Sequence, residues 1–137
     1  LYRIKALITF GTVVAGELGG YIETEKNLDH RGNAWVYGNA RVYGDALVYG
    51  DTLVYGDALV RSFAVISERK MIFCASNVGP KNRTLTVFNG KYGLIVTRGC
   101  FTGTVDEFLS KSKEVHDDKT HHEYKLLIEV AQSRILN

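Results

Sequence analysis

The sequence is poor in the residues that mark several common protein classes. It has one proline (Pro80), two cysteines (Cys74 and Cys100) and a formal net charge of only +2 over 137 residues. A charge this small does not indicate nucleic-acid binding, so nucleic acid is not an expected partner. No apolar run approaches the roughly 20 residues of a membrane helix, so no membrane partner is expected either. Arg3 and Lys5 interrupt the apolar start of the chain, which is unlike a signal peptide.

Composition and cysteine content indicate the general class and the compartment. Hydrophobic residues make up 45% and charged residues 23% of the chain, as in ordinary soluble globular proteins. A chain of 137 residues fits one domain, or one core with a packed appendage. Without secretion signals, Cys74 and Cys100 are predicted to be reduced and buried rather than joined in a disulfide. We therefore expect a cytoplasmic protein.

A six-residue repeat fills the middle of the chain. From Ala34 onward the units read AWVYGN, ARVYGD, ALVYGD, TLVYGD, ALVRSF and AVISER. The first place holds a small residue and the third a β-branched residue, and strand alternation points both to the same side. The Gly-Asp or Gly-Asn pair that closes most units is typical of a bend, because glycine adopts backbone angles that other residues avoid.

Three units of four strand residues and two bend residues predict one triangular coil of 18 residues, on which the next coil stacks in parallel. The register is expected to extend upstream, with Ile22 and Leu28 at first places and His30 at an inward third place. Downstream it extends to Ile66, which makes about eight rungs, and such short solenoids need covered ends. The predicted segments are an N-terminal cap at 1–21, a parallel β-helix at 22–69 and a C-terminal module at 70–137.

The second and fourth places of each unit face outward. Stacking by 18 residues puts Trp35 over Leu53 and Tyr37 over Tyr55, which predicts a flat aromatic and aliphatic patch. Such a patch is covered by the rest of the chain, forms a self-association interface or serves as a ligand platform. The patch is the predicted interface of a homo-oligomer, either a trimer or a dimer.

The pattern changes after Arg69. Residues 71–76 are strand-like and fit either one more rung or the start of a new sheet. Two capping-box signatures, Thr104-Val-Asp-Glu107 and Thr120-His-His-Glu123, each predict the start of a helix. The predicted elements are strands at 84–88 and 94–98 joined by a turn at 89–93, and helices ending near residues 115 and 136. This module is expected to cap the coil or to pack on its flat face.

Two further stretches, together with the repeat, carry a resemblance to a known group of proteins. They are Tyr2-Arg-Ile-Lys-Ala6 with Ala15-Gly-Glu-Leu-Gly-Gly-Tyr-Ile-Glu23, and Gly99-Cys-Phe-Thr-Gly-Thr-Val-Asp-Glu-Phe108 with His116 and Tyr124. The chain resembles the small hexapeptide-repeat, left-handed β-helix proteins common in phages and prophages. The resemblance implies a left-handed coil, a mainly β fold with an α+β cap, and a viral protein in the cytoplasm of a bacterial host. It brings no catalytic motif with it.

The predicted ligand site is a cluster of polar residues near the hairpin. Lys81 and Arg83 lie in a Gly-Pro loop, Arg98 ends a strand, and Thr102 and Thr104 lead into a helix. Free backbone N–H groups at a helix start, with cations nearby, suit an anion such as the phosphate of a nucleotide. The alternative is an ordinary strand-to-helix turn with solvated basic residues.

No catalytic residue, metal site or cofactor is predicted. Cys100 and the histidines His116, His121 and His122 lack the spacing of known metal motifs. Hexapeptide acyltransferases resemble the chain in the repeat, but they usually have a longer helix, a protruding loop and a catalytic histidine at a subunit boundary. In this sequence the histidine of the repeat region is His30, which is predicted to point into the coil.

The expected function is therefore that of a non-enzymatic binding protein. It would bind a host protein, or sequester a phosphorylated nucleotide signal, and so antagonise host defence. The alternatives are an acyltransferase-like enzyme remnant and a structural or virion accessory protein.

Overall fold

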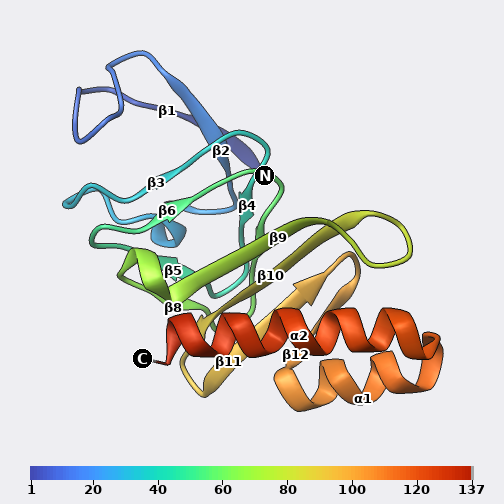
Figure 1. The fold of residues 1–137 in the computed structure, drawn as a ribbon. Helices are drawn as coiled ribbons and strands as arrows, with labels where there is room; N and C mark the ends of the chain where they lie inside the picture. Colours follow the sequence, from blue (N-terminus) through green and yellow to red (C-terminus); the bar gives the residue numbers. More distant parts are fainter. Residues whose placement is uncertain (137) are drawn as a thin grey trace.

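The computed structural model describes residues 1–136 as a mixed α/β fold in two parts. Short strands stacked by parallel pairing form the N-terminal part, and a four-stranded antiparallel sheet followed by two helices forms the C-terminal part (Figure 1). The hairpin and the two helices were predicted, but the fold as a whole is mixed α/β rather than mainly β, and the short parallel strand pairs form no closed β-helix among residues 1–136. We call these stacked strands, at 18–66, the coil. The elements are β1 (Tyr2–Lys5), β2 (Leu18–Ile22), η1 (Glu25–Asn27), β3 (Trp35–Val36), β4 (Arg41–Val42), β5 (Leu47–Val48), β6 (Leu53–Val54), β7 (Leu59–Val60), β8 (Val65–Ile66), η2 (Arg69–Met71), β9 (Ile72–Val78), β10 (Arg83–Gly90), β11 (Gly93–Arg98), β12 (Phe101–Thr104), α1 (Val105–Val115) and α2 (Asp118–Ile135).

The repeat region pairs in the register that its sequence predicts. Strands β3 and β6, β4 and β7, and β5 and β8 pair in parallel, each with residues eighteen apart opposite one another. The first and third places of the units point inward and are buried: Ala34, Val36, Ala40, Val42, Ala46, Val48, Thr52, Val54, Ala58, Val60, Ala64 and Ile66. The bend glycines, Gly38, Gly44, Gly50 and Gly56, have φ between 57° and 65°. The predicted interior and its glycine bends are thus confirmed.

Upstream of the repeat, the predicted register is wrong by two residues. Ile22 pairs with Val42, twenty rather than eighteen residues later, and the bridge from Leu28 to β5 has the same separation. Ile22 and Leu28 therefore fill the valine layer and not the small-residue layer. The two additional residues belong to the bend at 29–33, which leaves His30 exposed instead of inward.

Asn27 joins the first coil to the second. It is buried, and its side-chain Nδ2 donates to the carbonyls of Gly44 (3.2 Å) and Ala46 (2.9 Å). Its Oδ1 accepts from the backbone N–H groups of Glu23 (3.1 Å) and Thr24 (2.9 Å). Where η1 interrupts the strand, backbone pairing is lost, and the buried side-chain amide of Asn27 makes these hydrogen bonds instead.

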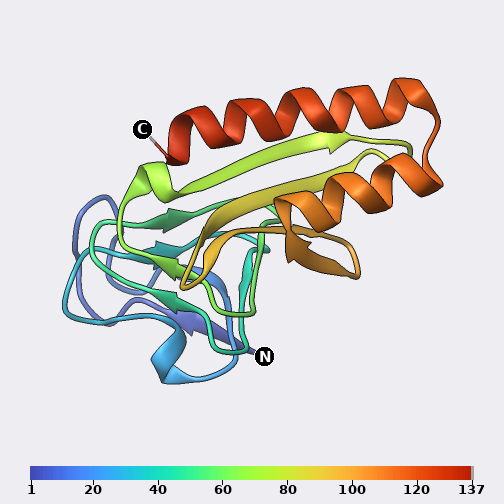
Figure 2. The same ribbon diagram turned by 90° about the horizontal axis from the view of Figure 1, so that it is seen from below.

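The C-terminal sheet has the strand order β12-β11-β10-β9. Strand β9 starts this new sheet and is not a further rung, and the predicted hairpin closes tightly with Gly90 opposite Gly93. Strand β12 was not predicted. The sheet lies between the coil and α2 (Figure 2). Within residues 1–136, no helix is long and apolar enough to cross a membrane.

The two helices begin differently from one another. Thr104 and Glu107 form the predicted capping box of α1. Helix α2 starts earlier than predicted, because the Asp117 carboxylate accepts from the Thr120 N–H at 2.8 Å and so makes Asp117 the N-cap. An aspartate is at least as good an N-cap as a threonine, and this one stands three residues upstream.

The antiparallel sheet closes one end of the coil. Thr97 Oγ1 donates to the Leu59 carbonyl (2.6 Å), and the Leu59 N–H donates to Thr86 Oγ1 (3.4 Å). Asn89 Nδ2 donates to the Val65 carbonyl at 3.0 Å. These side chains satisfy backbone groups of β7 and β8 that have no further coil to pair with. We call this end of the coil the closed end.

Candidate functional site

Two of the five residues of the predicted anion seat are already engaged by other groups. Arg61, from the last coil, donates its Nε to the Thr102 hydroxyl and its Nη2 to the carbonyls of Gly99 and Phe101, both at 2.8 Å. Thr102 therefore tethers the sheet to the coil.

The start of α1 is occupied as well. The Thr104 hydroxyl accepts from the Glu107 N–H at 3.1 Å, and the Glu107 carboxylate accepts from the Thr104 N–H at 2.9 Å. The hydrogen bonds from Thr104 hold the pKa of Glu107 below its usual value. A carboxylate of the chain itself thus occupies the helix N-terminus where the anion was expected.

Arg98, a third predicted residue, is in an unusual environment. It ends β11, is partly buried, and its Cζ lies 5.6 Å from the centre of the Tyr124 ring. Its Nε is shielded from solvent and has no hydrogen-bond partner among residues 1–136. No carboxylate in that part of the chain forms an ion pair with it. A partly desolvated cation without a counter-charge is costly in a folded protein.

The Arg98 guanidinium lies over the ring of Tyr124, and the hydrogen-bonding capacity of the Tyr124 hydroxyl is not fully used. It is fully buried, and its hydroxyl also lacks a hydrogen-bond partner among the described residues. Burial raises the pKa of Tyr124, although the Arg98 guanidinium opposes the shift. The phenol is therefore protonated at neutral pH. Two adjacent side chains thus have polar atoms that the described fold leaves unpaired.

A histidine pair borders the same tyrosine. The Ser112 hydroxyl lies 2.9 Å from His116 Nδ1 and 3.1 Å from His121 Nδ1, and the rings of His116 and Tyr124 are 5.4 Å apart. Burial, with a smaller contribution from Arg98, lowers the pKa of His116. His116 is therefore neutral at pH 7, since its ordinary pKa is already near 6.5.

The turn at Gly79, the turn at Gly99 and the turn between α1 and α2 bring these residues together at one end of the C-terminal module. The Gly79 N–H donates to the Glu123 carboxylate at 2.6 Å, and a side chain at Gly79 would meet the Tyr124 hydroxyl. Arg83 lies beside the turn after β11, where an added Cβ on Gly99 would be 3.2 Å from its Nη1. We call Arg83, Arg98, His116 and Tyr124 the Arg98 centre.

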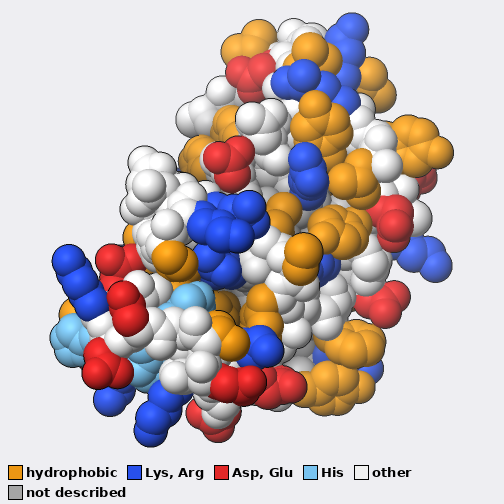
Figure 3. Space-filling model, turned by 90° about the vertical axis from the view of Figure 1, so that its right-hand side faces the viewer, with side chains coloured by type: hydrophobic (Ala, Val, Ile, Leu, Met, Phe, Trp, Pro, Cys, Tyr) orange, Lys and Arg blue, Asp and Glu red, His pale blue; other side chains and the backbone are white. Residues whose placement is uncertain are grey.

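Figure 3 shows the side of the molecule that is at the right in Figure 1, where Lys and Arg side chains gather near the middle of the view and histidines lie toward one end. Lys81 is exposed in the turn between β9 and β10, two residues before Arg83. Of the predicted seat, Arg83 and Arg98 remain. His116 and Tyr124 were missed as ligand-site residues, although both were noted in the tail motif.

The predicted aromatic patch is split by the N-terminal segment. Trp35 is only 5% exposed and packs edge-on against Phe10, with ring centres 5.4 Å apart. Tyr37 and Tyr55 stack at 4.7 Å as predicted, and the Tyr37 hydroxyl is within 3.2 Å of the Thr12 hydroxyl. Tyr55 remains 53% exposed, and Leu53 is partly buried. Cover therefore comes from residues before β2 and not from the C-terminal module.

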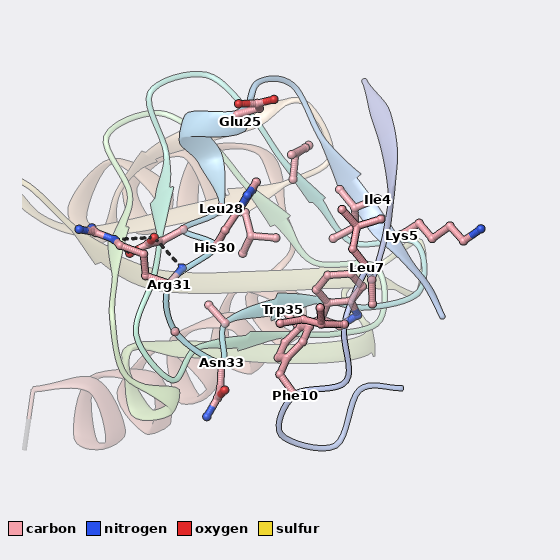
Figure 4. Close-up of a pocket in the computed structure, with 16 residues that line it drawn as sticks. Ile4, Lys5, Leu7, Phe10, Glu25, Leu28, His30, Arg31, Asn33 and Trp35 are labelled. Carbon is pink, nitrogen blue, oxygen red and sulfur yellow. Dashed lines mark hydrogen bonds and ion pairs between the residues drawn. The ribbon is translucent and has the colours of Figure 1, made fainter. Parts of the chain in front are cut away.

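A cavity of about 550 Å³ lies at the other end of the coil from the sheet. Its walls are mainly apolar and come from the N-terminal segment and the first coil: Ile4, Leu7, Phe10, Leu28, Ala34 and Trp35 (Figure 4). Polar side chains stand at its rim, among them Lys5, Glu25 and the ion pair of Arg31 with Asp29 at 3.1 Å. Sequence reasoning missed this cavity; the interruption of the repeat at 29–33 was the available signal. We call this side the open end.

The two cysteines differ from the prediction in their exposure. Cys74 and Cys100 are not joined, but both are exposed rather than buried as predicted. Local burial of its sulfur nevertheless raises the pKa of Cys74 to about 11, which keeps the thiol protonated. Among the residues described, no group of three or more His, Cys, Asp or Glu side chains is arranged to hold a metal ion.

Comparison of the chain with protein-family models, curated proteins and solved structures gives no match.

Proposed function

We propose that this protein is a non-catalytic binding protein that holds a phosphorylated ligand at the Arg98 centre. The observation that carries the proposal is the partly buried guanidinium of Arg98, which has no carboxylate partner in residues 1–136 and lies against the unpaired hydroxyl of Tyr124. Buried polar groups in proteins are nearly always satisfied, so two adjacent exceptions suggest that a ligand completes the set.

The chemistry of these groups favours a phosphate. A guanidinium binds phosphate oxygens through two parallel charge-assisted hydrogen bonds, and its geometry is fixed by its planarity. Arg83 is an exposed second cation, and its Nη1 lies beside Gly99, the residue that follows Arg98. The Tyr124 hydroxyl and the neutral His116 imidazole add hydrogen-bonding groups that need no charge of their own.

The protonation states support binding more than catalysis. Burial raises the pKa of Tyr124, so the phenol is not a base at neutral pH. The pKa of about 11 keeps Cys74 from acting as a nucleophilic thiolate. The acyltransferase-like and virion-accessory alternatives have no comparable observation in their favour, and His30 lies on an exposed bend.

The proposed scaffold is a short left-handed parallel β-helix. The three ladders β2–β4–β7, β5–β8 and β3–β6 would be its three faces, and the eighteen-residue register with glycine at the bends supports this reading. The left hand depends on the resemblance to phage hexapeptide-repeat proteins. On the same basis, the ligand would be a nucleotide signal of the bacterial host, sequestered in its cytoplasm to antagonise defence.

Titration calorimetry with adenosine 5′-monophosphate, and separately with inorganic phosphate, tests the proposal. We expect Arg98→Gln to weaken binding by at least about tenfold, or 1.4 kcal/mol, and Arg98→Lys to weaken it less because the charge remains. Arg41→Gln, an exposed arginine on β4, is the matched control and should bind as the wild type does. Absence of binding to both probes, or equal binding by Arg98→Gln, would overturn the proposal.

Stability without ligand separates a binding role from a structural one. Among residues 1–136, Arg98 has no ion pair to lose; its contact is with the ring and hydroxyl of Tyr124. Arg98→Gln should therefore change the free energy of unfolding by no more than about 1 kcal/mol. A loss of about 3–5 kcal/mol, the usual cost of breaking a buried ion pair, would show that Arg98 serves the fold instead.

A further inference from the structure

The open end of the coil is unusually apolar for an exposed surface. Strand β3 is the outer strand of its ladder and pairs only with β6 within residues 1–136. The segment that folds over this end exposes a set of large apolar side chains: Leu1, Tyr2, Leu7, Ile8, Val14 and Leu18. Exposed apolar groups gathered at one place mark interaction surfaces, whereas scattered ones do not.

Within this set, Leu7 and Ile8 stand out. They are 88% and 67% exposed, and both also line the mouth of the 550 Å³ cavity. The same surface therefore carries a protruding apolar segment and an apolar hollow beside it (Figure 4). That combination is self-complementary, which a two-fold interface between identical chains requires.

We propose that the open end is the interface of a two-fold dimer in which the Leu7–Ile8 segment of each protomer enters the cavity of the other. A small ligand in the cavity would leave most of the exposed Leu7–Ile8 segment in water, whereas a second copy covers this segment together with the cavity. The proposal is independent of the ligand assigned to the Arg98 centre.

Charges at the rim agree with a second copy as the occupant. Lys5 and Glu25 both line the cavity, have opposite charges and form no ion pair within residues 1–136. A two-fold axis places the Lys5 of one protomer on the side of the other that carries Glu25, and the reverse contact follows by symmetry. The C-terminal sheet and helices, which carry the Arg98 centre, lie away from this end (Figure 1).

Sedimentation velocity across a wide range of protein concentration tests the interface. The wild type should sediment as a dimer, and the variant carrying Leu7→Asp and Ile8→Asp as a monomer. Because both side chains are largely exposed, the variant should still fold, which circular dichroism and a cooperative thermal transition would verify. Tyr92→Asp, equally apolar and 78% exposed but on the sheet hairpin, is the matched control and should remain dimeric.

A charge exchange tests the pairing itself. Lys5→Glu should raise the dimer dissociation constant severalfold, and adding Glu25→Lys to it should restore the wild-type constant. A wild type that is monomeric at all concentrations, a trimer, or a dimer that survives the Leu7 and Ile8 substitutions would overturn the proposal. Loss of the dimer in Tyr92→Asp would overturn it as well, because the interface would then lie elsewhere.

Discussion

The two ends of the coil finish the same repeat in opposite ways. At the closed end, side chains of β10 and β11 bond to the backbone of β7 and β8, and Phe88 enters the coil core. At the open end, the N-terminal segment covers Trp35 with Phe10 but leaves a cavity and a group of exposed apolar side chains. One end is completed by the chain itself, and the other is left incomplete.

This difference concerns the backbone groups that are left at the two ends of the stacked strands. A coil end exposes backbone N–H and C=O groups that need partners, because each unpaired buried group costs as much as a lost hydrogen bond. Thr97, Thr86 and Asn89 supply these partners at the closed end. The open end instead presents hydrophobic surface, which is what an interface with another molecule uses.

The largest expected effect is at the closed end. Phe88→Ala removes a fully buried ring that reaches from β10 into the coil core, and should cost about 3–5 kcal/mol in the free energy of unfolding. Urea unfolding measures this, with Phe63→Ala as control because Phe63 is 46% exposed and should lose under about 1 kcal/mol. Equal losses in the two variants would mean that the sheet only rests against the coil.

A somewhat smaller loss is expected next to the open end. Asn27→Leu leaves two buried carbonyls and two N–H groups without their partner, and should cost about 3 kcal/mol. Asn39→Leu, at an exposed bend, should change stability by less than about 0.5 kcal/mol in the same urea titration. If Asn27→Leu were as mild as its control, the first coil would be loosely attached and the open end would extend further inward.

One substitution made at both ends compares them directly. Thr97→Val removes the partly buried 2.6 Å hydrogen bond to the carbonyl of Leu59 and should cost about 1–2 kcal/mol. Thr12→Val removes the 3.2 Å contact with the exposed Tyr37 hydroxyl and should cost at most about 0.5 kcal/mol. Thermal unfolding of the two variants gives the ranking. The reverse order would contradict the assignment of closed and open ends.

The repeat itself was predictable because its code is local. From Ala34 to Ile66, alternation and the glycine bends determine which side chains point inward, and the structure places them there. The register failed before Ala34 because the bend at 29–33 has two extra residues, while the Gly32-Asn33 pair that ends it looks like that of an ordinary unit. Trp35 sits at an outward place, and nothing in the repeat shows that Phe10 folds back over it.

The ligand site was only partly predictable, for a different reason. The capping box at Thr104 and Glu107 was visible in the sequence, and it already implied that a carboxylate fills the helix N-terminus. Thr102 is tethered by Arg61, a partner forty-one residues away, which no local pattern indicates. The unpaired atoms of Arg98 and Tyr124 are a property of packing between strand and helix, so only the three-dimensional structure reveals them.

The smallest effect concerns the bend at the closed end. Ser62 has φ 63° where the preceding units have glycine, which strains a residue that has a Cβ by about 1–2 kcal/mol. Ser62→Gly relieves this strain but adds about 0.5–1 kcal/mol of backbone entropy to the unfolded chain. A net gain of a few tenths of a kcal/mol should appear as a slightly higher unfolding temperature.

Gly56→Ala is the reverse change, and it measures the free-energy cost of the backbone angle by itself. Gly56 has φ 62°, and no described atom lies within 4 Å of the position its Cβ would take, so the cost of about 1 kcal/mol is that of the backbone angle alone. Ser62 tolerates the same angle because the next carbonyl, of Phe63, accepts from the Lys91 N–H at 2.9 Å and fixes the bend against the sheet. If Ser62→Gly destabilised the protein by as much as Gly56→Ala does, the serine would be contributing to the closed end rather than being held in place by it.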